Sequence, residues 1–210
     1  ASAELRDLLA DQPESVRLLD MNPIHVSTKG TVDARFETAI AVFMRDDLLP
    51  AVQAEYGRLL PEGERPEFVI AEVAPRHYAY VNRHGQTSAL REQYRGRAAD
   101  GAFHVVYHAS GERFFGRFDA LVHVTSLPAG AGTAWTLNVH ALPGSQLVKA
   151  VARISVVKAY FNHKARSVSA LAAAICESLC REASPPRSAG ESAAHPGMGA
   201  KHGRLLMGLP

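Results

Sequence analysis

The clearest pattern in the chain is an alternation of apolar and polar residues in two neighbouring stretches, 117–125 and 135–140, with Leu121 as the one exception. A period of two is typical of a β-strand with one buried face. The two stretches flank the loop LPAGAG, which predicts an antiparallel hairpin. The residues expected on its buried face are Phe118, Ala120, Val122, Val124, Trp135, Leu137 and Val139.

After this hairpin the apolar period lengthens from two residues to three or four. Pro143 and Gly144 end the strand, and Ser145 is a suitable N-cap for a helix. Apolar residues at these spacings form one helix face that is wide enough to lie on a sheet. They are Leu147, Val151, Ile154, Val157, Phe161, Val168, Leu171, Ile175 and Leu179. We therefore expect one long helix packed against the hairpin.

The residues before the hairpin predict helices and further strands. A short amphipathic helix over 3–10 precedes a break at Pro13. We expect this helix to pack against the folded domain or to cap it; contact with a partner is the alternative. The other predicted elements are a strand over 23–34, helices over 33–43 and 46–59, and strands over 67–73, 77–83, 89–97, 103–108 and 112–125. The stretch 89–97 also fits a helix, and Ser110-Gly111 predicts a tight turn. This run of antiparallel strands argues against a parallel, doubly wound sheet.

Composition favours one globular domain with two extensions. The chain has 210 residues, of which 47% are apolar and 21% charged, and a formal net charge of +2. The excess positive charge lies near the C-terminus, so the folded part lacks the electrostatic signature of nucleic acid binding. We divide the chain into an N-terminal helical extension (1–22), a folded domain (23–183) and a flexible tail (184–210) rich in Pro, Gly, Ser and Ala. As an alternative to a tail without contacts, Leu205-Leu206-Met207 would form a small docking motif.

The two cysteines predict a reducing environment. Cys176 and Cys180 are four residues apart on the predicted last helix, a spacing that does not suit a disulfide and makes a weak metal site without other ligands. No apolar run approaches the roughly 20 residues that span a bilayer, and the start lacks the basic and apolar regions of a signal peptide. We therefore expect a cytoplasmic protein with no membrane insertion.

Two phrases of the sequence resemble the START-like, helix-grip superfamily (SRPBCC), which includes polyketide cyclases and birch-pollen-allergen-type proteins. VDARFETAIAVFMRDDLLP, Val32–Pro50, resembles the end of a strand, a helix with aromatic residues and a break that contains Asp. GTAWTLNVHALPG, Gly132–Gly144, resembles the last strand before the long helix. The resemblance covers most of residues 24–180. It implies an α+β helix-grip fold, in which a curved antiparallel sheet wraps around a long C-terminal helix and encloses a mostly apolar cavity.

Members of this superfamily bind lipids, sterols, plant hormones or polyketide chains in that cavity, and some catalyse cyclisation or dehydration. The resemblance therefore implies that this chain binds a small hydrophobic or aromatic, polyketide-like ligand and promotes its cyclisation or dehydration. The alternative is a non-catalytic carrier of a lipid or another hydrophobic ligand. The lack of an evident acid–base pair favours the carrier, whereas tyrosines on inward faces favour the enzyme.

The candidate site residues lie on the predicted inward faces of strands. In the stretch 77–83, Tyr78, Tyr80 and Asn82 share one side, which we expect to face inward; tyrosines in an ordinary core are the alternative. A buried tyrosine offers both apolar surface and a hydroxyl that can donate to a carbonyl. The candidate catalytic residues are therefore Tyr80 and Tyr107. The candidate ligand-binding residues are Tyr78, Asn82, Phe103, Phe118, Trp135, Leu137 and Phe161.

Four histidines, His104, His108, His123 and His140, fall on the predicted outward side of strands that can be neighbours. The simplest interpretation is that these histidines lie on a solvated surface. The alternatives are that they form the contact of a homodimer, or that they form a zinc-binding or pH-sensing cluster. No HxH or HExxH spacing occurs and no carboxylate is placed to orient the rings, so we expect no metal.

Sequence motifs for cofactors and for standard catalytic machinery are absent. The chain has no GxSxG elbow, no GxxxxGK[ST] loop and no GxGxxG after a strand. Glu72 and Asp119 stand in predicted strands but are expected to face solvent, so no pair of carboxylates for acid–base catalysis is identifiable. We expect no cofactor.

Overall fold

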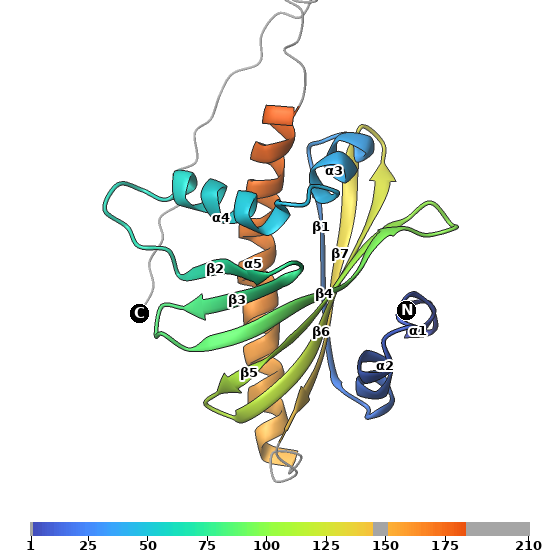
Figure 1. The fold of residues 1–210 in the computed structure, drawn as a ribbon, viewed down its shortest axis with the longest axis vertical. Coiled ribbons are helices and arrows are strands. Elements are labelled where there is room, and N and C mark those ends of the chain that lie inside the picture. Colours follow the sequence, from blue (N-terminus) through green and yellow to red (C-terminus); the bar gives the residue numbers. More distant parts are fainter. Residues whose placement is uncertain (1, 145–150, 184–210) are drawn as a thin grey trace, which may run out of the picture.

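The computed structural model describes residues 2–144 and 151–183 and shows a curved seven-stranded sheet with one long helix on its concave side (Figure 1). The strand order is β1-β7-β6-β5-β4-β3-β2, and every pairing is antiparallel. The strands are β1 (Ile24–Val32), β2 (Phe68–Ala74), β3 (His77–Asn82), β4 (Thr87–Arg97), β5 (Phe103–Arg113), β6 (Gly116–Ala129) and β7 (Gly132–Pro143). The helices are α1 (Ser2–Leu8), α2 (Pro13–Asp20), α3 (Phe36–Phe43), α4 (Leu48–Leu59) and α5 (Val151–Ala183). The predicted α+β helix-grip fold is confirmed.

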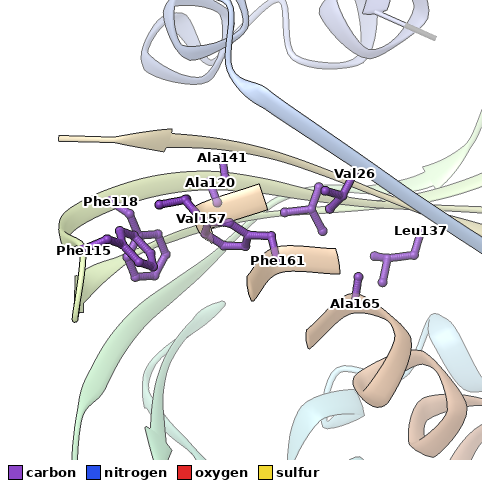
Figure 2. Packing of buried hydrophobic residues seen from close by; sticks show 10 residues of the cluster. Val26, Phe115, Phe118, Ala120, Leu137, Ala141, Val157, Phe161 and Ala165 are labelled. Carbon is purple, nitrogen blue, oxygen red and sulfur yellow. The ribbon is translucent and has the colours of Figure 1, made fainter. Parts of the chain in front are cut away.

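The apolar stripe of α5 packs into the concave face of the sheet. Val157 and Phe161 lie against Phe118 of β6, and Leu137 of β7 belongs to the same cluster (Figure 2). Ile175, further along α5, packs in a second cluster with α3, α4 and β2. Burial of each such side chain contributes roughly 1.5–3 kcal/mol. The curved sheet and α5 are therefore held together along most of the helix.

The hairpin between β5 and β6 turns later than the sequence pattern predicted. Ser110 and Gly111 lie inside β5, and the strand continues to Arg113. Glycine is needed at position 111 because a Cβ there would lie 2.7 Å from Oγ of Ser88 on β4. Gly116 instead marks the turn, with a φ of 95°. The prediction of a turn at Ser110-Gly111 is therefore wrong, and the ambiguous stretch 89–97 is part of strand β4.

The N-terminal helices lie on the outer face of the sheet, opposite α5 (Figure 1). The apolar residues that join them to the sheet are Leu5, Leu9, Leu18, Leu19, Val106 and Leu121. As expected, the first helix packs, and Pro13 begins a second helix, because proline suits the first turn. No described helix has an apolar stretch long enough to cross a bilayer. Ser145, Leu147 and the predicted tail, with its Leu205-Leu206-Met207 motif, lie outside the described residues.

Candidate functional site

A cavity of about 420 Å³ lies between the concave face of the sheet, α5 and the α3–α4 segment. Most of its wall is apolar, and no Asp or Glu of the described residues lines it. Representative apolar lining residues are Phe43, Leu49, Ile70, Val105, Val122 and Leu171. Such a cavity suits a small hydrophobic molecule with a few polar groups.

Seven of the nine predicted site residues line this cavity: Tyr80, Asn82, Tyr107, Phe118, Trp135, Leu137 and Phe161. The other two, Tyr78 and Phe103, are each 2% exposed and are absent from the cavity wall. They pack beneath α3 with Phe36 and Ile40. The side of β3 that carries the tyrosines does face inward, but Tyr78 is taken up by the core because α3 covers it.

The Tyr107 side chain lines the cavity in front of a buried ion pair. Glu92 of β4 stands directly opposite Tyr107 in the strand register, and its carboxylate forms a salt bridge with Arg95. The Glu92 side chain is fully buried and that of Arg95 is 7% exposed. Arg95 also donates a hydrogen bond of 3.1 Å to the carbonyl oxygen of Phe43, at the C-terminal end of α3. This ion pair therefore joins the sheet to α3 directly behind the cavity wall.

Burial keeps the Tyr107 hydroxyl protonated. Desolvation raises the pKa of Tyr107 well above its usual value of 10.0, and the negative charge of Glu92 raises it further. The hydroxyl lies beside Arg95 but forms no well-formed hydrogen bond with the described residues. The hydroxyl therefore keeps a proton that it can donate.

The ion pair escaped the sequence reasoning because of a β-bulge. Strict alternation would place Glu92 and Arg95, three residues apart, on opposite faces of the strand. A register shift between Glu92 and Tyr94 changes that parity, so both side chains reach the concave side. No short-range sequence pattern marks the bulge, because β4 carries several charged residues and nothing distinguishes Glu92 and Arg95 among them.

The two candidate catalytic tyrosines lie at different levels of the cavity. Tyr80 pairs with Ser88, which pairs with Gly111 of β5. Gly111 and Tyr107 are four residues apart, about 14 Å along the strand. Burial raises the pKa of Tyr80, whose ring stacks on Phe68 with centroids 5.2 Å apart. Because of this separation, the two hydroxyls would meet different parts of a ligand.

Arg113 brings a positive charge to the Tyr80 end of the cavity. Its guanidinium donates a hydrogen bond of 2.6 Å to Oγ of Ser88 and lies 5.6 Å from the centre of the Phe118 ring. Lys164 of α5 also lines the cavity. Neither residue forms a salt bridge with a carboxylate among the described residues. The charged part of the lining contributed by the described residues is therefore cationic.

A second pair of polar groups lies on β6 and β7. Ser126 and Trp135 are directly opposite each other in the register, and both line the cavity. Oγ of Ser126 and Nε1 of Trp135 are buried and have no hydrogen-bond partner among the described residues. The indole N–H can only donate, whereas the hydroxyl can donate or accept. Both polar atoms are thus buried within the wall rather than exposed on its surface.

The side chain of Asn82 forms hydrogen bonds at the end of β3. Its Oδ1 accepts hydrogen bonds of 3.0 Å from the backbone N–H groups of His84 and Gln86, and its Nδ2 donates to Oε1 of Gln86 at 2.9 Å. These bonds stabilise the turn between β3 and β4. The amide of Asn82 is thus already engaged, although the residue contributes to the cavity wall.

The histidines on the outer face are mostly buried, contrary to the prediction of a solvated surface. His104, His123 and His140 are 0%, 3% and 8% exposed. Nδ1 of His104 lies 2.9 Å from Nε2 of His123, while His140 stacks on His25 with ring centroids 4.7 Å apart. A carboxylate does approach these histidines, because Nε2 of His104 is 3.3 Å from Oε1 of Glu4 on α1. The N-terminal helices, which cover this face, explain the difference.

His108 is the most exposed of the four histidines and also contacts a carboxylate. Its Nε2 lies 3.2 Å from Oδ1 of Asp119 on the neighbouring strand. The Asp119 side chain is half exposed, so this contact contributes little to stability. The expectation that no carboxylate orients a histidine is therefore wrong at both positions.

Together, the strand pairings, α5 and the cavity define a helix-grip protein with a mostly apolar cavity. No protein-family model matches the chain, and no curated protein matches it. Similar solved structures include a START superfamily protein from Mycobacterium smegmatis, with 14% identity and a TM-score of 0.45, covering 76% of this chain and 99% of that one. The sequence resembles the same superfamily.

Two further solved structures are enzymes by name. Norcoclaurine synthase from Thalictrum flavum, in complex with dopamine and hydroxybenzaldehyde, is 12% identical with a TM-score of 0.47; the match covers 77% of this chain and 90% of that one. The di-domain ARO/CYC StfQ from the steffimycin biosynthetic pathway is 12% identical with a TM-score of 0.49, over 86% of this chain and 59% of that one. The fold described above is defined by the strand pairings of this chain and by α5.

Proposed function

We propose that the protein binds a small hydrophobic or aromatic, polyketide-like molecule in the cavity. The observation that carries this proposal is the mostly apolar cavity wall, in which the charged side chains contributed by the described residues are those of Arg113 and Lys164. The apolar body of a ligand would cover this wall. A ligand oxygen that reached the polar atoms of Tyr107, Ser126 or Trp135, which are buried in the wall without well-formed hydrogen bonds, would remove a cost of about 1–3 kcal/mol for each.

Arg113 and Lys164 support an acidic group at one end of this ligand. A carboxylate would neutralise their charge, and a guanidinium binds a carboxylate more strongly than a neutral oxygen. The proposed ligand is therefore amphiphilic, with an apolar or aromatic body and an anionic end near Tyr80.

A second proposal, catalysis of cyclisation or dehydration, is favoured by Tyr107 and the ion pair behind it. A hydrogen bond from Tyr107 to a ketone oxygen would stabilise the negative charge that develops when an enol carbon attacks that carbonyl. The fixed cavity wall would hold the chain in a bent conformation close to the reacting geometry. Tyr80, at the other level of the cavity, would orient the far end of the substrate. The carrier remains the alternative if no turnover occurs.

Native mass spectrometry of the gently purified full chain, followed by identification of what denaturation releases, tests both proposals. A polyketide or aromatic product favours the enzyme, and a mixture of fatty acids or lipids favours the carrier. Binding itself is tested by titrating 1-anilinonaphthalene-8-sulfonate and following energy transfer from Trp135, the only tryptophan.

A cavity-filling variant provides the control for this titration. Ala109→Phe places a ring into the cavity wall, whereas Ala159→Phe changes an exposed position of α5. We expect at least a tenfold loss of affinity only for Ala109→Phe, with circular dichroism showing that both variants remain folded. Equal affinities for both variants would contradict binding in the cavity.

A further inference from the structure

Three potential ligand residues meet on the outer face of the sheet, on the side opposite the cavity. Glu4 belongs to α1, Asp100 to the turn between β4 and β5, and His104 to the beginning of β5. One oxygen of each carboxylate and one nitrogen of His104 all lie within 4.8 Å of one another. The N-terminal helix α1, the turn between β4 and β5 and the beginning of β5 therefore each contribute one residue to this cluster.

His104 is fully buried, and one of its nitrogens is aimed into this cluster. Its Nδ1 lies 2.9 Å from Nε2 of His123, and Oγ1 of Thr125 is 3.2 Å from the same His123 atom. These contacts fix the orientation of the His104 ring, as groups behind a metal ligand commonly do. Its Nε2, on the opposite side of the ring, has no well-formed hydrogen bond among the described residues.

The distance between His104 and Glu4 suits two ligands of a common ion better than a direct hydrogen bond. Nε2 of His104 and Oε1 of Glu4 are 3.3 Å apart, longer than the roughly 2.7–2.9 Å of a charge-assisted hydrogen bond. Two ligand atoms that each lie about 2.1 Å from one ion are roughly 3.0–3.4 Å apart.

The surrounding charges also favour a cation. Neither Glu4 nor Asp100 pairs with a lysine or arginine in the part of the chain that the structure describes. Asp100 accepts a backbone hydrogen bond of 3.0 Å from Ala102 N. Two carboxylates that face each other without a counterion repel, and a bound cation removes that repulsion.

We propose that Glu4, Asp100 and His104 bind a divalent transition-metal ion, of the Zn²⁺ or Mn²⁺ class. One imidazole nitrogen with two carboxylate oxygens is a donor set for such ions, whereas Ca²⁺ and Mg²⁺ prefer oxygen ligands alone. Because Glu4 lies on α1 and the other two ligands lie on the sheet, the ion holds the N-terminal helices against the outer face. The site is structural and independent of the cavity.

Calorimetric titration of the chelator-treated full chain with Zn²⁺ tests this site, using Glu4→Gln and Asp100→Asn. Asp100 is exposed and the Glu4 side chain is 43% exposed, so these variants fold even where a change at buried His104 would not. Asp119→Asn is the matched control, because it removes the carboxylate from another His–Asp contact, with His108. We expect one Zn²⁺ per chain, a higher melting temperature with Zn²⁺, and affinity at least tenfold lower in the first two variants only.

Two results would overturn the site. One is the absence of stoichiometric binding at micromolar Zn²⁺, and the other is unchanged affinity in both Glu4→Gln and Asp100→Asn. Titration with Co²⁺ adds a direct readout, since its visible absorption reports nitrogen and oxygen coordination. We expect the Co²⁺ spectrum of the unmodified chain to be lost in Asp100→Asn and retained in Asp119→Asn.

Discussion

Gly30 and Trp135 face each other across the pairing of β1 with β7, and the indole ring occupies the space that a side chain at Gly30 would need. A Cβ at Gly30 would lie 2.6 Å from Cζ2 of Trp135. The glycine therefore lets the indole lie against the sheet and form part of the cavity wall.

The first prediction is that Gly30→Ala displaces Trp135. The clash should destabilise the fold by about 1–3 kcal/mol, alter the tryptophan fluorescence and weaken binding of the naphthalene probe. Gly57→Ala is the control, because no atom lies within 4 Å of a Cβ at that helical position; it should be neutral or stabilising by up to about 1 kcal/mol. Denaturant unfolding measures both, and equal stabilities would contradict the role given to Gly30.

The second prediction separates Tyr107 from the core tyrosine Tyr78. Tyr107→Phe should change stability by less than about 1 kcal/mol, because the lost hydroxyl makes no well-formed hydrogen bond. Affinity for a ligand with a ketone oxygen, and any cyclisation or dehydration turnover, should fall at least tenfold. Tyr78→Phe, behind the cavity wall, should leave both unchanged. A Tyr107→Phe protein with full affinity and turnover would remove Tyr107 from the proposed function.

The third prediction concerns the buried ion pair. Arg95→Met removes the buried partner of the Glu92 carboxylate and the hydrogen-bond donor at the end of α3, and it leaves only the more distant, solvent-exposed Arg76, 3.5 Å from Glu92 Oε1, among the described residues. This change should cost about 3 kcal/mol. Arg97→Met breaks the exposed salt bridge with Glu37 and should cost less than about 1 kcal/mol. Urea unfolding of the two variants gives the comparison. Similar losses would show that burial does not set the strength of the Arg95 interaction.

The fourth prediction is a loss of stability in acid that depends on His140. Burial, followed by the charge of His25, lowers the pKa of His140 from 6.5 to about 4. Between these values the unfolded state binds more protons than the folded state, so the free energy of unfolding falls as the pH drops from about 6.5 to about 4. The contribution is on the order of 1–2 kcal/mol after solvent screening.

Substitution of His140 tests this sign and window. His140→Gln should reduce the decrease in melting temperature between pH 7 and pH 4.5. His163→Gln, at an exposed position of α5, should follow the unmodified protein. If His140→Gln and the unmodified protein lose the same stability over this range, the acid sensitivity has another origin.

The fifth prediction addresses the anionic end of the ligand. Arg113→Met should weaken binding of 2-naphthoic acid at least tenfold and leave its methyl ester nearly unaffected, because only the acid carries a charge at neutral pH. Arg117→Met, an exposed position outside the cavity wall, is the control. Equal losses for acid and ester would indicate that Arg113 acts through packing on Phe118 rather than through its charge.

The sequence predicted the order of the strands and most of the helices, although not α2, and seven of the nine residues that it placed at the site do line the cavity. Both outcomes depend on local periodicity. Alternation brought Phe118, Trp135 and Leu137 to one face, and the stripe that contains Phe161 identified α5. The resemblance to the helix-grip superfamily supplied the arrangement of sheet and helix. The cytoplasmic location and the homodimer stay predictions.

Only the tertiary structure decided which polar groups meet. The bulge after Glu92 turned Arg95 toward the same side, and the packing of α1 buried His104 beside Glu4 and Asp100. Local patterns encode the face on which a side chain lies, because they repeat with the geometry of one element. Contacts between elements depend on register, on irregularities such as the bulge and on which surface a distant helix covers, and these are fixed only when the whole chain packs.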